Sequence, residues 1–153
     1  MTPATPHLPI RLFADDGAIR RVGTAFLDHS LPKAEWTHEA HLATCAWLII
    51  ERLDINPARD LPRLIAAFNV AKGGVNDATS GYHETITQAY VQGVRSFLAS
   101  HRHGSLSARI NALLSSPNGA RDWPLRFWSH SVLFSIPARR GWVEPDLASL
   151  PDC

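Results

Sequence analysis

Two histidines stand three residues apart in the stretch EWTHEAHLATCAW, residues 35–47. Because an α-helix has about 3.6 residues per turn, His38 and His41 share one helical face. A third histidine, His83, stands three residues before Ile86 in GYHETITQAY, at the start of another apolar helical pattern. The apolar positions of both patterns place all three histidines on the inward faces of their helices. Three inward imidazoles are consistent with core residues, a metal clamp or an acid–base set.

The elements that must position these histidines are all expected to be helices. No segment shows the alternation of apolar and polar residues that is typical of a strand. We predict one domain, residues 1–153, built as a bundle of four main helices with one or two extra short helices and an irregular C-terminal tail. Residues 1–16 and 143–153 are expected to be extended or loose. The main helices are predicted at about 18–29, 37–53, 61–72 and 82–100, the shorter ones at 106–116 and 123–134, and the tail from residue 136 onward.

The bundle geometry predicts where the histidines meet. With short loops, successive helices alternate in direction, so the second and fourth helices begin at the same end of the bundle. The first and third helices end there, which adds Asp28 or His29 from one side and Asn69 or Lys72 from the other. The glycine-containing segment 72–81 is expected to close over the same end. Five segments of the chain are therefore predicted to converge on one polar pocket.

The histidine types and their location favour a metal centre. The partial positive charge of a helix N-terminus disfavours imidazolium, and neutral imidazole is the form that binds a metal or acts as a base. We predict His38, His41 and His83 as ligands of one transition-metal ion, with zinc, iron, copper and nickel all open. Glu84 is a candidate fourth ligand or general base, although it points about 100° away from His83 on an ideal helix. The predicted catalytic residues are His83 and Glu84, and the predicted binding residues are Trp36, Asn69, Lys72 and Tyr82.

The sequence HEAH differs from the zincin motif, which needs two histidines four residues apart. Here the spacing is one residue short, and Glu39 points away from the face that His38 and His41 share. We therefore reject a zincin. The metal hypothesis depends on the agreement in helical phase between this pair and His83.

Composition narrows the function classes. The formal net charge is +1, hydrophobic residues make up 45% of the chain, and no stretch concentrates lysine or arginine. This argues against a nucleic-acid groove or a membrane-surface helix. The longest apolar run, CAWLII, is too short to span a membrane, and the first residues lack the apolar run of a signal peptide. With only Cys45 and Cys153, a structural disulfide is not expected, and we predict a cytoplasmic protein.

Several blocks of the sequence resemble a family of small, uncharacterised bacterial proteins. The blocks are WTHEAHLA, FNVAKGG, GYHETIT and LFSIPARRGWVEPDLASLP, and the resemblance spans roughly residues 24–151. The family pattern combines W-T-H-x-x-H-L, an F/Y-N block, G-Y-H-E-T-x-T and W-V-E-P-D. This sequence matches it at His38, His41, Asn69, His83 and Glu84. Because the family has no assigned activity, the resemblance implies a common site but no reaction.

Three functions remain open at this point. The first is a metal-dependent enzyme that hydrolyses or oxidises a small molecule, with Glu84 as general base. The second is a metal-free isomerase or lyase in which histidine and glutamate move protons. The third is a ligand-binding or interaction module, including a possible homodimer, with Trp123, Trp128 and Trp142 as either partner surface or internal packing.

Overall fold

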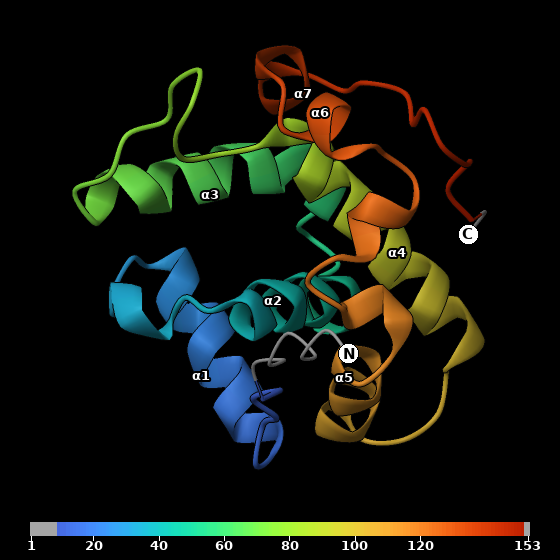
Figure 1. The fold of residues 1–153 in the computed structure, drawn as a ribbon. Coiled ribbons are helices and arrows are strands. Elements are labelled where there is room, and N and C mark those ends of the chain that lie inside the picture. The colour runs from blue at the N-terminus through green and yellow to red at the C-terminus, as the bar shows by residue number, and fades with distance from the viewer. Residues whose placement is uncertain (1–8, 152–153) are drawn as a thin grey trace, which may run out of the picture.

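The structure, a computed structural model, describes residues 9–151 and confirms the all-α prediction (Figure 1). No β-strand occurs within that range, and none of its helices is long and apolar enough to cross a membrane. The five longer helices form a helical bundle, and two short α-helices and three 3-10 turns complete the fold. Their bounds are α1 Asp16–Leu27, η1 Lys33–Glu35, α2 His38–Glu51, α3 Pro57–Ala71, α4 Glu84–Ser100, α5 Leu106–Leu114, η2 Pro117–Gly119, η3 Trp123–Arg126, α6 His130–Leu133 and α7 Ile136–Arg140.

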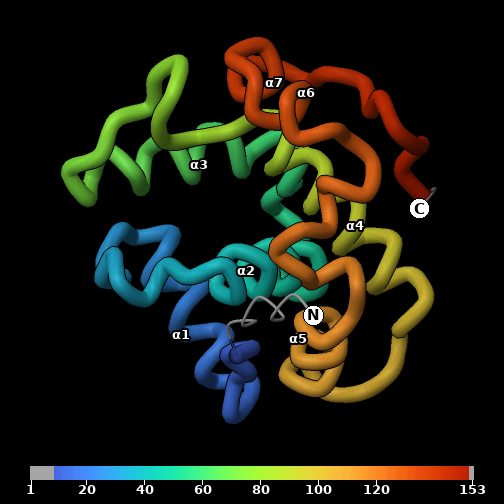
Figure 2. The backbone as a smooth tube through the Cα atoms, viewed as in Figure 1, coloured from blue at the N-terminus to red at the C-terminus, as the bar shows by residue number. Residues whose placement is uncertain are grey.

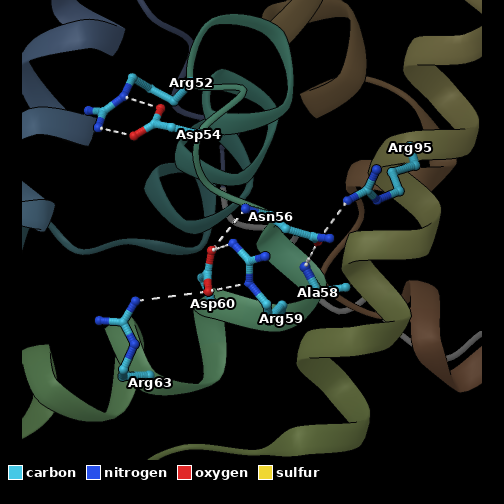
Figure 3. Close-up of polar contacts among 8 residues, drawn as sticks. All are labelled: Arg52, Asp54, Asn56, Ala58, Arg59, Asp60, Arg63 and Arg95. Carbon is cyan, nitrogen blue, oxygen red and sulfur yellow. Dashed lines mark hydrogen bonds and ion pairs between the residues drawn. The ribbon is translucent and has the colours of Figure 1, made fainter.

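Helix α3 begins at Pro57, four residues before the predicted start. Asn56 caps it, because its Oδ1 accepts a hydrogen bond from the amide of Ala58 at 3.1 Å and another from Arg95 at 3.2 Å (Figure 3). The Asp60 carboxylate completes a reciprocal capping arrangement, because it accepts a hydrogen bond from the amide of Asn56 at 2.9 Å. The pKa of the Asp60 carboxyl is lowered to about 2. The hydrogen bond from the Arg59 guanidinium is the largest cause, and the hydrogen bond from the Asn56 amide is the next. Proline suits the first helical position, because a backbone N–H at that position would have no partner within the helix, so its absence costs no hydrogen bond.

The prediction of one helix over 123–134 is wrong. The segment divides into η3 and α6, because a turn after Phe127 lets Ser129 start a new helix by capping Val132. The predicted irregular tail is also interrupted, since Ser135 caps the further helix α7. Beyond α7 the chain is irregular as expected, and Trp128 holds it in place by donating its indole N–H to the Val143 carbonyl at 2.8 Å.

Helix α2 is the centre of the fold (Figures 1 and 2). It contacts α1, α3, α4 and α5, and every residue from Leu42 to Leu48 is buried. A helix that is apolar on all sides is stable in water only when other elements surround it. Glu39 is the buried charge of its first turn, and the Arg121 guanidinium approaches it to 3.3 Å. The predicted start of this helix is confirmed, with Thr37 as its cap.

Two tryptophans of the C-terminal third are internal. Trp123 and Trp128 are buried with Ala89 and Leu133 in a second, smaller core against α4. Trp142 is partly exposed and packs edge-on against Trp128, with ring centroids 5.4 Å apart. Internal packing therefore accounts for Trp123 and Trp128.

Helix α1 approaches α2 closely at one glycine. A Cβ atom added at Gly23 collides with the ring of Trp47. The ring is held in that place from its other end, because its indole Nε1–H donates to Glu51 at 3.0 Å. Gly23 is thus the position at which α1 makes room for α2.

We expect the substitution Gly23→Ala to lower the free energy of unfolding by about 1–3 kcal/mol, because overpacking outweighs the higher helix propensity of alanine. The control is Gly17→Ala in the same helix, where the new Cβ meets only Asp15 Oδ1 at 3.4 Å. That change is expected to be neutral or to stabilise by up to about 1 kcal/mol. Urea unfolding measures both, and equal stability of the two variants contradicts the packing argument.

Candidate functional site

A cavity of about 620 Å³ lies where four of the five predicted segments meet, and we call it the outer cavity. The fifth, the end of the first helix with Asp28 and His29, does not line it. It is bounded by η1, the first turns of α2 and α4, the C-terminal half of α3 and the loop that joins α3 to α4. Figures 1 and 2 show α3 and this loop facing the segment between α1 and α2. Six residues predicted to be functional line it: Trp36, His41, Asn69, Lys72, Tyr82 and His83.

A smaller cavity of about 220 Å³ continues inward between α2, α3 and α4, and we call it the inner cavity. His38 lines it together with His41, and most of its other walls are apolar. The two cavities share five lining residues and are therefore neighbours; we refer to both together as the helix-end cleft. The shared residues are Trp36, His41, Ile65, Ile86 and Thr87.

His41 is fixed by its own helix. Its Nδ1 lies 2.7 Å from the carbonyl oxygen of Thr37, which accepts hydrogen bonds only, so Nδ1 carries the proton and donates it. The ring also packs against Trp36, with ring centroids 3.9 Å apart. Nε2 is therefore the lone-pair nitrogen, and it is the nitrogen of this ring that is left for a ligand in the cleft.

Burial sets the charge of His41. Removal of the ring from water penalises imidazolium and lowers the pKa of His41 to about 4, although the hydrogen bond to Thr37 acts in the opposite direction. The neighbouring His38 lowers it further. His41 is consequently a neutral hydrogen-bond acceptor at pH 7, in agreement with the neutral form expected near a helix N-terminus.

An aromatic cluster forms the wall beside His41. Trp36 stacks on Phe26 with ring centroids 4.3 Å apart and planes inclined by 7°, and it contacts Phe68 at 5.3 Å. The Trp36 indole Nε1 is buried and has no hydrogen-bond partner among the described residues. A buried donor without an acceptor is costly and uncommon in folded proteins. It marks this wall as a place where an acceptor would be favourable.

His83 has a different role from the one predicted. It is the N-cap of α4, and its Nδ1 accepts a hydrogen bond from the amide of Ile86 at 3.1 Å. Its Nε2 donates to the carbonyl of Leu133 at 2.8 Å. Burial, as the largest cause, lowers the pKa of His83. Both ring nitrogens are thus occupied in linking α4 to α6, and neither is left for a metal or a substrate.

His38 has one occupied nitrogen. Its Nε2 lies 2.8 Å from the carbonyl oxygen of Gly119, so it donates a proton there and leaves Nδ1 as the lone-pair nitrogen. Within residues 9–151, no group of three or more His, Cys, Asp or Glu side chains is placed to hold a metal ion. The predicted ligand set of His38, His41 and His83 is not brought together in the arrangement described, and a metal centre stays a prediction.

Glu84 and Tyr82 bind each other. The Tyr82 hydroxyl donates to Glu84 Oε1 at 2.8 Å, and Gln88 donates to the same oxygen at 2.9 Å. The pKa of Tyr82 is raised, with burial as the largest cause and the hydrogen bond to the Glu84 carboxylate as the next. Glu84 is not among the residues that line either cavity. A general-base role for Glu84 in the cleft therefore stays a prediction, while Tyr82 contributes to the wall of the outer cavity.

Asn69 joins the cleft to its covering loop. Its side-chain amide donates to Asn76 Oδ1 at 3.0 Å, and Asn76 in turn donates to the carbonyl of Ala66 at 2.9 Å. The amide of Tyr82 also donates to Asn76 Oδ1 at 3.0 Å. This network holds the loop between α3 and α4 against α3.

Three cleft residues were missed by the sequence reasoning: Lys33, Thr87 and Tyr90. Thr87 and Tyr90 follow His83 at helical spacing, so the phase of α4 was a signal for both. The Tyr90 hydroxyl donates to the carbonyl of Ala120 at 2.7 Å. Lys33 gave no helical signal, although lysine is scarce in this chain, with one other at position 72.

Comparison of the chain with protein-family models, curated proteins and solved structures gives no match. The resemblance of its sequence blocks to an uncharacterised bacterial family therefore stays a prediction.

The low pKa of His41 predicts a pH-dependent stability. The folded-state pKa of about 4 lies below the ordinary value of 6.5, so the unfolded chain takes up a proton first as the pH falls. Stability is thus lost on acidification through this window. We expect His41→Asn, which keeps a donor for Thr37 but does not titrate, to lose about 2 kcal/mol less than the wild type between pH 7 and pH 5.

The matched control is His101→Asn. Like His41, His101 donates its Nδ1–H to the carbonyl four residues earlier, that of Phe97, and its ring stacks on the Phe97 ring. Unlike His41, it is exposed and lies outside the cleft. This variant should keep the wild-type pH dependence in urea unfolding. An unchanged pH dependence in His41→Asn is the outcome that contradicts a buried, neutral His41.

Proposed function

We propose that this chain binds a small molecule in the helix-end cleft and transfers a proton to or from it, with Nε2 of His41 as the proton acceptor. The observation that supports this most is the single free nitrogen of His41. The hydrogen bond from Nδ1 to Thr37 selects the tautomer and leaves Nε2 as the lone-pair nitrogen. His41 lines both cavities together with Trp36, whose indole donor is unpaired among the described residues, and with apolar side chains. The reaction class is that of a metal-free isomerase or lyase.

The pKa of His41 determines how such a base would operate. A pKa of about 4 keeps Nε2 unprotonated at pH 7, so the acceptor is always available, but it also makes the free site a weak base. A negative charge placed beside the ring favours imidazolium and raises its pKa. Ligand binding would therefore strengthen this base at the moment when it is needed.

A metal-dependent enzyme is the second candidate, and one observation favours it. His38 and His41 each donate a hydrogen bond from one ring N–H to a backbone carbonyl. Proteins commonly orient metal-binding histidines in this way, with the other ring nitrogen on the metal. His83 would join them only by giving up a hydrogen bond to Ile86 or Leu133. Two histidines with ligands from substrate or water would make up this site.

Isotope exchange tests proton transfer without knowledge of the substrate. The protein is incubated in D₂O with a mixture of small carboxylic acids, ketones and amides, and deuterium incorporation is read by mass spectrometry. We expect exchange into at least one compound, unaffected by EDTA and lowered about 100-fold or more in His41→Asn. His101→Asn serves as the control and should retain the wild-type rate.

Exchange that is equal in His41→Asn and wild type, or no exchange with any compound, overturns the proton-transfer proposal. Exchange that is lost in EDTA and restored by zinc or iron supports the metal-dependent candidate instead. In that case, metal analysis of protein purified without a histidine tag should show a bound metal that His38→Ala, His41→Ala loses.

Cytoplasmic location and a homodimer are kept as proposals. Phe134, Ile136 and Trp142 are exposed large apolar side chains near one another along the chain, and we propose them as the residues that a second copy would cover.

A further inference from the structure

The two lysines of the chain both line the outer cavity. Lys33 belongs to η1, which precedes α2, and Lys72 caps the C-terminal end of α3. In Figure 1 the segment between α1 and α2 lies opposite the C-terminal end of α3. Two lysines from different elements therefore line the same cavity.

Arginine supplies the basic charge elsewhere. Every ion pair found among the described residues uses an arginine, and neither Lys33 nor Lys72 forms one. Lys72 instead lies over the ring of Phe68, with Nζ 5.6 Å from the centroid. The two lysines thus line one cavity and have no ion-pair partner among the described residues.

The lining of the outer cavity, over residues 9–151, includes no aspartate or glutamate. The carboxylates nearest to it in the chain are engaged elsewhere. Glu35 accepts from Arg21 at 3.0 Å, and Glu84 accepts from Tyr82. Asp77 accepts from the amide of Ser80 at 2.9 Å, and Asp28 accepts from the amide of Ser30 at 2.9 Å. Of these, Asp28 acts electrostatically on Lys72, and the Lys72 ammonium contributes to lowering the pKa of the Asp28 carboxyl. The cavity itself thus has cationic groups without an anionic counterpart.

The inner cavity has the opposite character. Apolar side chains make up most of its wall, and the thiol of Cys45 is protonated because burial raises its pKa to about 12. Apolar surface removed from water gains roughly 25 cal/mol per Å². A ligand that fills both cavities gains from a charged head at one end and from an apolar body at the other. The apolar wall is made by Leu42, Cys45, Leu61, Ile65, Ile86 and Val91.

We propose that the ligand is an amphipathic anion, with a carboxylate or phosphate head at Lys33 and Lys72 and a hydrocarbon body in the inner cavity. This inference rests on the proposed function, because it names the ligand class of the same cleft. It also supplies the negative charge that strengthens His41 as a base. Trp36 lines both cavities, and its buried indole N–H has no acceptor among the described residues.

Three probes that differ in the head group test this proposal: octanoate, octyl phosphate and the neutral octanamide. Binding is measured by isothermal titration calorimetry with the full chain at pH 7. We expect both anions to bind at least about tenfold more tightly than octanamide. The double variant Lys33→Gln, Lys72→Gln should lower octanoate affinity by about tenfold or more and leave octanamide affinity unchanged.

The control double variant is Arg102→Gln, Arg126→Gln. It removes the same charge from two exposed positions outside both cavities and should bind octanoate within about twofold of the wild type. Equal affinity for octanamide and octanoate, an equal loss in both double variants, or no binding of any octyl probe overturns the amphipathic-anion proposal. A preference for octanoate over octyl phosphate, or the reverse, tells which head group the lysines accept.

Failure of this proposal is distinguishable from failure of the proposed function. Deuterium exchange that depends on His41, in a protein that binds octanamide as tightly as octanoate, retains the proton-transfer site and rejects the anionic ligand. Octanoate binding that depends on the lysines, without any exchange, retains the ligand class and rejects the reaction.

Discussion

The burial of α2 on all sides is the constraint on which the rest of the structure depends. A seven-residue run without a polar face has to be enclosed, and α1, α3, α4 and α5 enclose it. The charged side chains and the imidazoles of α2 consequently lie at its ends: Glu51 at the C-terminal end, and His38, Glu39 and His41 in the first turn, where the helix emerges into the cleft. Within the buried run, Thr44 is the polar residue. Glu39, which faces away from the cleft, is neutralised by Arg121.

His38, His41 and His83 share the inward helical phase in the sequence, but they have three different environments in the structure. A buried imidazole must satisfy its N–H, and each ring finds a different backbone carbonyl: Gly119 for His38, Thr37 for His41 and Leu133 for His83. The rings differ in the role of the second nitrogen. In His83 this nitrogen caps α4, which is a structural role, whereas in His41 it is left unoccupied by the described residues and the ring lines a cavity. The chemistry of the cleft follows from this difference.

The cleft combines a low dielectric interior with positive charge at the outer cavity. Burial by the surrounding helices keeps His41 neutral, while no aspartate or glutamate of residues 9–151 lines the outer cavity beside its two lysines. These features support each other physically, since an anion that pairs with the lysines also favours protonation of the nearby imidazole. The geometry thus couples ligand charge to the proton affinity of His41, on which the neighbouring His38 also acts.

Local patterns in the sequence determined the all-α class, the cap at Thr37, the inward phase of His38, His41 and His83, and the meeting of four of the five expected segments at one pocket. The end of α1, with Asp28 and His29, lines neither cavity. Helical periodicity and turn residues act over a few neighbours, so they can be read without the fold. They failed where polar side chains compete locally, as at Asn56, which starts α3 early, and at Ser129 and Ser135, which start α6 and α7. Only the tertiary structure decided which nitrogen of each histidine is free, that Glu84 pairs with Tyr82, and that Lys33 and Lys72 share a cavity. Those outcomes depend on carbonyls and side chains up to 81 positions away in the chain, to which no local pattern refers.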